Sequence, residues 1–228
     1  MSAPRSVDSG SANRVAVLSS GGLDSAVLIA EFLKLGHVVQ PIYVRFGLAW
    51  EKVEEEQLRR FLGTLPGHRA HPVLTLDFPI TDVYGSHWSV SGDDVPDATS
   101  TDDAVYLPGR NLLLLAKSSI WCALHDVRNL ALGTLKGNPF ADSSRAFFRI
   151  VESAVHTALN FDLEVITPFA GLTKSEVLER GRGLELHHTF SCIDPQGDQH
   201  CGRCNKCAER RRAFATLGIN DGTRYAAL

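Results

Sequence analysis

The sequence predicts an α/β protein: a mostly parallel sheet with helices on both of its faces, followed by a small C-terminal metal-binding region. Two observations carry this prediction. Short apolar runs alternate with longer helical patterns along most of the chain, which is typical of parallel strands joined by crossover helices. In addition, four of the five cysteines lie within residues 192–207.

The N-terminal elements alternate between strand and helix. Residues 14–18 predict a short buried strand, which is followed by a glycine-bearing turn and an apolar helix at residues 26–33. Residues 38–46 predict a second strand, residues 50–61 a helix with a charged face, and residues 70–76 a third strand. Parallel sheets of this kind bind ligands beyond the carboxyl ends of their strands, which is where the turn after the first strand would lie.

The remaining elements continue the alternation around two segments without apolar periodicity. Residues 85–104 and 137–144 are rich in turn-forming residues and are expected to be loops. The other segments are defined by their apolar pattern, with helices expected at residues 111–125, 145–159 and 174–181 and strands at residues 130–135 and 163–168. Thr173 is the expected N-cap of the last helix.

The turn after the first strand has the composition of a phosphate-binding loop. Its sequence is Ser20-Gly21-Gly22-Leu23-Asp24-Ser25. Adjacent glycines let a ligand approach the main chain, and the following helix directs its free N–H groups and its positive dipole end at the turn. Asp24 beside phosphates requires Mg²⁺ or an N–H group to face, or else it caps the helix. Neither G-x-x-x-x-G-K-[ST] nor G-x-G-x-x-G is present.

The clustered cysteines have the spacing C-x8-C-x2-C-x2-C, and they are Cys192, Cys201, Cys204 and Cys207. Four thiolates suit a closed tetrahedral Zn²⁺ site, and an iron–sulfur cluster is the alternative. Disulfides fit poorly because nothing marks the chain as secreted. Since four protein ligands leave no open position for a catalytic water, we expect zinc to hold the chain and the chemistry to lie elsewhere.

Four motifs together resemble one enzyme family. The turn matches the S-G-G-x-D-S signature of the N-type ATP pyrophosphatases, which cleave ATP to AMP and pyrophosphate. With Leu107-Pro108-Gly109-Arg110-Asn111, Thr173-Lys174-Ser175-Glu176 and the four cysteines, the chain resembles the 7-cyano-7-deazaguanine synthase (QueC) family over most of residues 14–217. The resemblance implies a Rossmann-like (adenine nucleotide alpha hydrolase-like) sheet. It also implies a homodimer that uses ATP, Mg²⁺ and ammonia to convert the carboxylate of 7-carboxy-7-deazaguanine into a nitrile, through adenylated intermediates.

The resemblance also implies roles for individual residues. Asp24 and Lys174 would be catalytic, and ATP would be bound by Ser20, Gly21, Gly22, Leu23, Asp24, Ser25, Arg110, Asn111 and Lys174. Without the resemblance, Arg110 would be a solvated charge and Asn111 a helix cap. Lys174 begins a helix, where its charge opposes the dipole unless an anion lies nearby.

Asp142 and Arg145 are the expected substrate-binding residues. They lie where the family usually carries Ser-Gly-Tyr-Pro-Asp-Cys-Arg, but here residues 134–145 keep only parts of that order. Altered lining residues can change which ligand a polar pocket accepts. The nearest alternative is therefore a related ATP pyrophosphatase that activates a different carboxylate or a modified deazapurine. Transfer-RNA thiolation and a non-catalytic zinc-dependent binding module are weaker alternatives.

Composition is that of an ordinary globular enzyme. The chain has 228 residues, 44% hydrophobic residues and a net charge of −3, so no global field attracts nucleic acid or an anionic membrane. No apolar run reaches the length of a transmembrane helix, and residues 1–13 lack the apolar stretch of a signal peptide. We expect a cytoplasmic protein with a flexible leader at residues 1–13, an ATP pyrophosphatase domain at residues 14–185 and a zinc-binding region at residues 186–228. The basic run at residues 210–212 is expected to be a solvated helix face.

Overall fold

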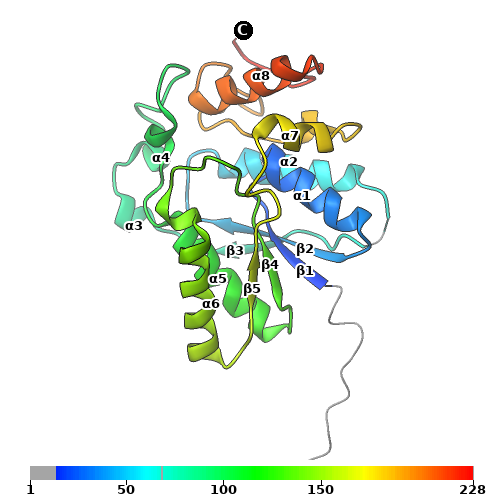
Figure 1. Ribbon diagram of the computed structural model, residues 1–228. Helices are drawn as coiled ribbons and strands as arrows, with labels where there is room; N and C mark the ends of the chain where they lie inside the picture. Colours follow the sequence, from blue (N-terminus) through cyan, green and yellow to red (C-terminus); the bar gives the residue numbers. More distant parts are fainter. Residues whose placement is uncertain (1–13, 68, 228) are drawn as a thin grey trace, which may run out of the picture.

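The structure, a computed structural model, describes residues 14–67 and 69–227 (Figure 1). Parallel strands form a five-stranded sheet in the order β3-β2-β1-β4-β5. The strands are β1 (Arg14–Leu18), β2 (Val38–Arg45), β3 (Leu74–Asp77), β4 (Asn129–Ala131) and β5 (Glu164–Ile166). The predicted α/β class is confirmed. The expected flexible leader lies outside the described residues.

Helices cover both faces of the sheet, as Figure 1 shows. One face carries α1 (Leu23–Lys34), α2 (Glu51–Thr64) and α7 (Lys174–Arg180), and α8 (Asn205–Leu217) packs on α7. The opposite face carries α5 (Arg110–Leu124) and α6 (Arg145–Leu159). Shorter helical segments are α3 (Thr81–Tyr84), α4 (Trp88–Ser91) and the 3-10 turns Asp102–Val105, Ala141–Ser143 and Leu186–His188.

Strand β1 is buried on both sides, which explains its uninterrupted apolar run. Ala16 and Leu18 belong to the apolar cluster that contains Leu115 of α5. Val15 and Val17 belong to the second cluster, which is built on α1 and α7. Successive side chains of a strand point to opposite faces, so this short strand ties the two helical layers together.

The direction of strand order reverses at β1. The chain runs outward from β1 to β2 and β3, and then returns to place β4 and β5 on the other side of β1. A crevice opens at such a switch point beyond the carboxyl ends of the two central strands, and ligands of open α/β sheets bind there. The segment Ser20–Ser25 follows β1 and Gly133 follows β4, so both border this crevice.

Some predicted elements differ from the observed ones. Residues 85–104 were expected to be a plain loop but contain α4 and the turn Asp102–Val105. The expected strand at residues 70–76 begins only at Leu74, because Ala70 makes an isolated bridge to Val39 instead of joining the ladder. Thr173 caps α7 as predicted, in a capping box with Glu176.

The prediction that residues 210–212 form a solvated face is wrong for Arg210, which is 1% exposed. Its guanidinium donates to the Leu186 carbonyl at 2.8 Å and to the Thr189 hydroxyl at 2.8 Å. It also lies 3.6 Å from the carboxylate of Asp221. These partners satisfy a charge that would otherwise be too costly to bury.

The C-terminal region shares its core with the sheet. Ala213 and Phe214 of α8 belong to the same apolar cluster as Val15 and Val17. The expected boundary between residues 185 and 186 stays a prediction. Within the described residues, none of the helices combines the length and the apolar character that crossing a bilayer requires.

Candidate active site

The loop between β1 and α1 is shaped to leave main-chain N–H groups free. Gly21 has φ of 71°, and Gly22 is the N-cap of α1 without a side-chain cap. The Phe190 N–H donates to the Gly21 carbonyl at 2.7 Å, so the C-terminal region holds the loop in place. Ser25 donates its hydroxyl to the Gly22 carbonyl at 3.2 Å. The Gly22 N–H donates to the Ser20 hydroxyl at 3.4 Å, whereas α1 itself begins without a side-chain cap, so its first N–H groups are available to a ligand in the crevice.

Gly21→Ala is expected to lower the free energy of unfolding by about 2 kcal/mol or more, because an L-residue is strained at positive φ. An added Cβ would also lie 2.8 Å from the main-chain oxygen of Glu54. Gly63→Ala is the matched control: Gly63 lies in α2 with nothing within 4 Å of its Cβ position. This control should raise stability by up to about 1 kcal/mol. Urea unfolding of both variants measures the contrast, and equal effects would contradict the strained role of Gly21.

Two adjoining cavities open at the crevice. The larger, of about 280 Å³, lies between the ends of β1, β2 and β4 and the start of α5. The smaller, of about 180 Å³, lies between the start of α1, α7 and the start of α8. The residues that line both are Ser20, Asp24, Arg110 and Lys206.

The structure brings most of the predicted site residues to these cavities. Those that line the larger one are Ser20, Asp24, Ser25, Arg110, Asn111 and Asp142. Those that line the smaller one are Ser20, Gly22, Leu23, Asp24, Arg110 and Lys174. Segments from four different parts of the chain thus converge on a single crevice.

Asp24 and Lys174 form an ion pair at the junction of the cavities. The Lys174 ammonium lies 2.7 Å from Asp24 Oδ2 and 3.5 Å from Glu209 Oε1. Burial acts to lower the pKa of Lys174, but the carboxylates of Asp24 and Glu209 outweigh it and raise the pKa, so the ammonium stays charged. The protein itself therefore supplies anions that offset the unfavourable charge of Lys174 at the start of α7.

Asp24 keeps one oxygen unused. Its Oδ1 is buried and has no hydrogen-bond partner among residues 14–67 and 69–227. A buried carboxylate oxygen without a partner is costly, and a hard divalent cation such as Mg²⁺ is a fitting ligand for it. The donor chemistry at this position therefore fits a metal–nucleotide complex.

Asp142 and Arg145 occupy different environments. Asp142 accepts hydrogen bonds from the Asn111 N–H at 3.2 Å and from the Asn111 amide at 3.3 Å. It thereby fixes the start of α5. Arg145 does not line either cavity, because Glu152 binds its guanidinium at 2.7 and 3.0 Å and the Val165 carbonyl accepts from it at 2.9 Å. The structure does not bring Arg145 to the other site residues.

Sequence reasoning missed the buried acids of α2. Glu54 lines the smaller cavity and accepts a 2.7 Å hydrogen bond from the Tyr43 hydroxyl. Burial raises the pKa of Glu54 to about 7, against the opposing charge of Arg110. The neighbouring carboxylates of Glu51 and Glu55 are also buried. Glutamate in a helix normally indicates a solvated face, so composition gave no signal for this burial.

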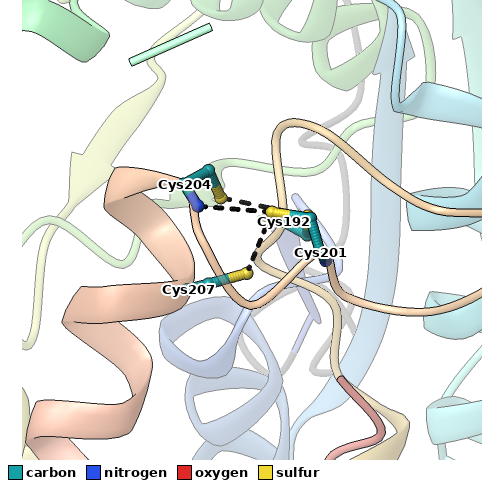
Figure 2. A group of neighbouring side chains, drawn as sticks. All are labelled: Cys192, Cys201, Cys204 and Cys207. Atoms are coloured by element: carbon teal, nitrogen blue, oxygen red, sulfur yellow. Dashed lines mark hydrogen bonds between the residues drawn. The ribbon is translucent and has the colours of Figure 1, made fainter. Parts of the chain in front are cut away.

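The four cysteines converge in a second, buried site (Figure 2). Their sulfur atoms all lie within 4.8 Å of one another, with 3.9 Å between Cys192 and Cys204 and 3.9 Å between Cys201 and Cys207. Ideal tetrahedral Zn–S bonds of about 2.3 Å place sulfur atoms about 3.8 Å apart. All four are free thiols, and the Cys201 N–H points at the Cys192 sulfur at 3.2 Å. The arrangement fits a single tetrahedral metal ion and no disulfide.

A parallel α/β sheet with an S-G-G-x-D-S loop at its switch point defines the PP-loop class of nucleotide-binding folds. Residues 14–218 match the family model described as queuosine biosynthesis protein QueC, and the chain belongs to this family. The predicted family is therefore confirmed.

Curated relatives agree with this family, and a solved structure agrees with the fold. The chain is 31% identical to 7-cyano-7-deazaguanine synthase of Halobacterium salinarum strain R1, over 95% of this chain and 97% of that protein. It is 29% identical to 7-cyano-7-deazaguanine synthase 1 of Desulfitobacterium hafniense, over 89% of this chain and 91% of that protein. A 4-thiouridine synthetase solved with RNA and bound ATP has a TM-score of 0.50 at 16% identity. The matched region spans 91% of this chain and 51% of the synthetase chain. The likeness concerns the fold alone.

Proposed function

We propose that this protein uses ATP to convert 7-carboxy-7-deazaguanine and ammonia into 7-cyano-7-deazaguanine. The observation that carries the proposal is the crevice in which the Ser20–Ser25 loop, the Asp24–Lys174 pair and Arg110 meet at the switch point of the sheet. The relatives that align with this chain over most of their length are named 7-cyano-7-deazaguanine synthase, and these names support the same reaction.

The chemistry proceeds through two activations. The substrate carboxylate attacks the α-phosphorus of ATP, pyrophosphate leaves, and an acyl adenylate forms. Ammonia attacks the acyl carbon, AMP leaves with the carboxylate oxygen, and a proton is lost to give the amide. The amide oxygen then attacks the α-phosphorus of a second ATP and pyrophosphate leaves again. Loss of AMP, which takes the former amide oxygen, and of the two protons on nitrogen yields the nitrile. Activation is needed because oxide is a very poor leaving group, whereas AMP is a good one.

The protein contributes positioning and charge. The free N–H groups at the start of α1 would hold phosphate oxygens, and Arg110 would bind the polyphosphate or the carboxylate from the opposite wall. Lys174, fixed by Asp24, would stabilise the negative charge that develops on the departing pyrophosphate. Mg²⁺ held by Asp24 Oδ1 would neutralise part of the phosphate charge. No side chain need act as a covalent nucleophile.

The larger cavity is the proposed site for the planar heterocycles of the reaction, the adenine of ATP and the deazapurine. Tyr106 and Phe140 stack with ring centroids 4.8 Å apart, and both line this cavity beside Asn138 and Asp142. An aromatic wall with adjacent polar groups suits a planar heterocycle. Phe140 lies in the segment that departs from the usual family pattern. The alternative substrate, another carboxylate or a modified deazapurine, would therefore be selected here.

The remaining features follow from the family. We infer that the four cysteines hold one structural Zn²⁺ and that the protein works in the cytoplasm without a stable nucleic-acid partner. A homodimer is also inferred. Leu112, Ile120 and Leu124 of α5 and Ile150 of α6 are exposed apolar residues on the outer helical layer, which supports such an interface.

Mass spectrometry tests the proposed reaction directly. Protein incubated with ATP, Mg²⁺, ammonium and 7-carboxy-7-deazaguanine should form the amide and then the nitrile, with AMP and pyrophosphate as by-products. ADP and phosphate as the main products would contradict the chemistry. If ATP binds but no amide or nitrile appears, the altered loop has changed the substrate specificity. The alternative function, activation of a different carboxylate or a modified deazapurine, would then be the better assignment.

Asp142→Asn is expected to raise KM for the deazapurine about tenfold and to raise KM for ATP much less. A carboxylate facing the amino-imino edge of the base would make a charge-assisted contact, whose loss costs about 1.5–3 kcal/mol. Asp162→Asn is the matched control, because Asp162 is 79% exposed and lines neither cavity. Equal rises in both KM values would show that Asp142 acts only through Asn111.

A further inference from the structure

Lys206 joins the four-cysteine site to the nucleotide crevice. It lies between Cys204 and Cys207, in the first turn of α8. Both flanking cysteines are buried, and their sulfur atoms point toward the common centre (Figure 2). Lys206 itself lines both cavities, together with Ser20, Asp24 and Arg110 of the proposed active site. Sequence reasoning assigned it no role.

A continuous chain of charges links Lys206 to the phosphate-binding loop. Its ammonium lies 2.8 Å from Glu209 Oε2, and the other oxygen of Glu209 lies 3.5 Å from the Lys174 ammonium. Lys174 in turn lies 2.7 Å from Asp24. Two ammonium groups and two carboxylates sum to zero charge, so this chain alone supplies no excess positive charge to a polyphosphate.

Lys174 and Lys206 differ in the number of carboxylates with which each pairs. Lys174 faces both Asp24 and Glu209, and its side chain is 22% exposed. Lys206 faces Glu209 alone among the ion pairs of the described residues, and its side chain is 32% exposed. An incoming anion can therefore recruit Lys206 while Glu209 remains paired with Lys174. A lysine ammonium keeps three donors, so one carboxylate leaves capacity for phosphate oxygens.

We propose that Lys206 binds the β- and γ-phosphates of ATP and that the four-cysteine site serves to position it. The inference rests on the proposed ATP-dependent function and deepens it. The two-residue gap between Cys204 and Cys207 fixes the first turn of α8, and with it the direction of Lys206. The cysteine site then acts on the reaction through a positioned charge and not only through fold stability.

The competing explanation is that Lys206 only forms a surface ion pair with Glu209 and binds no ligand. Lys206 and Glu209 are three residues apart on a helix, and exposed pairs of that kind contribute little to stability. Arg203 offers the matched comparison, because it lies between Cys201 and Cys204 and pairs with Asp194 at 3.0 Å. Arg203 lines neither of the two crevice cavities. Lys206 and Arg203 therefore both lie in the cysteine loop, and each pairs with an acidic residue of its own. Of the two, Lys206 alone lines the crevice cavities.

Binding measurements by isothermal titration calorimetry test the proposal with ATP plus Mg²⁺, pyrophosphate plus Mg²⁺, and AMP as separate ligands. Lys206→Ala should weaken ATP and pyrophosphate about tenfold or more and leave AMP unchanged, since a charge-assisted contact is lost only at the terminal phosphates. Lys206→Arg should restore most of the loss, because it keeps the charge. Arg203→Ala should bind all three ligands as the wild type does. Zinc content should be the same in every variant.

Three outcomes would overturn the inference. Wild-type affinity of Lys206→Ala for pyrophosphate would show that Lys206 does not contact the phosphates. Equal weakening by Arg203→Ala, or a fall in zinc content with Lys206→Ala, would assign the effect to the cysteine loop as a whole. If the wild-type protein fails to bind ATP at all, the proposed function itself is overturned, and this result is distinct from the other two.

Discussion

Asp24→Ala protein should lose turnover by about a thousandfold or more while it keeps its fold. Asp24 lines both cavities, pairs with Lys174 at 2.7 Å and carries the buried Oδ1 without a partner. Its removal would take away the proposed ligand of Mg²⁺ and would also free Lys174 from the position in which it faces the loop. Loss of a single positioned electrostatic group typically reduces kcat by about 10²–10³, and here two functions are lost together.

The control for this variant lies on the same pair of helices. Glu31 of α1 pairs with Arg180 of α7 at 3.5 Å, away from both cavities, so Glu31→Ala removes an acid that links the same elements. This control should retain near-normal turnover. Asp24→Asn keeps the shape of the side chain and should be almost as inactive as Asp24→Ala, because the charge is what the mechanism uses. Release of pyrophosphate is the assay, and circular dichroism and zinc content verify the fold. Substantial activity of Asp24→Asn would contradict the proposed metal-binding role.

The loop and the fold class could be predicted because their signals are local. An uninterrupted apolar run at residues 15–18, followed after two serines by Gly21 and Gly22, specifies a buried strand and a tight turn within a dozen residues. Thr173 and Glu176 likewise specify the start of α7 through a capping box made of near neighbours. The residues that give each signal lie close together in the sequence, so the element can be predicted without knowing which distant segments pack against it.

The buried charges could not be predicted because their partners lie on other secondary-structure elements. Glu54 is satisfied by Tyr43 on β2, the strand that precedes α2, and Glu55 by Arg45 of β2 and by Thr75 on β3. Only the packing of α2 against the sheet brings these groups together. Arg210 is a similar case, because its partners come from two segments on either side of α8 in the sequence. Without that geometry, such residues look like solvent-facing charges.

Arg145 shows the opposite kind of discrepancy. A motif match placed it with the substrate, but Glu152 lies seven residues later, two turns along the same helix, and captures its guanidinium. Motif spacing records which residues are near in sequence and says nothing of competing partners on a helix face. Lys206 was missed for a related reason. Its proposed phosphate-binding role depends on how the cysteines orient the first turn of α8.

Cys204→Ser protein is expected to lose its bound metal and about 4 kcal/mol or more of its free energy of unfolding. Loss of a structural metal is among the few single changes with effects of this size, because metal binding is coupled to folding. Cys204 is also the N-cap of α8 and belongs to the same buried cluster as Cys192 and Cys201. The site therefore fastens α8 to the core, and the first turn that carries Lys206 should loosen when the metal is lost.

Cys122→Ala is the matched control for this prediction. Cys122 is fully buried in α5, outside the metal cluster, and burial raises the pKa of its thiol to about 12, so it is an unreactive apolar residue. Its replacement should lower stability by the modest amount that a small cavity costs and should leave the metal content at about one ion per chain. Elemental analysis and thermal unfolding measure both variants.

Wild-type protein with stoichiometric iron and a brown colour would overturn the zinc assignment in favour of an iron–sulfur cluster. Full metal content in Cys204→Ser would show instead that three cysteines suffice, and the coupling between this site and α8 would then be weaker than the geometry implies.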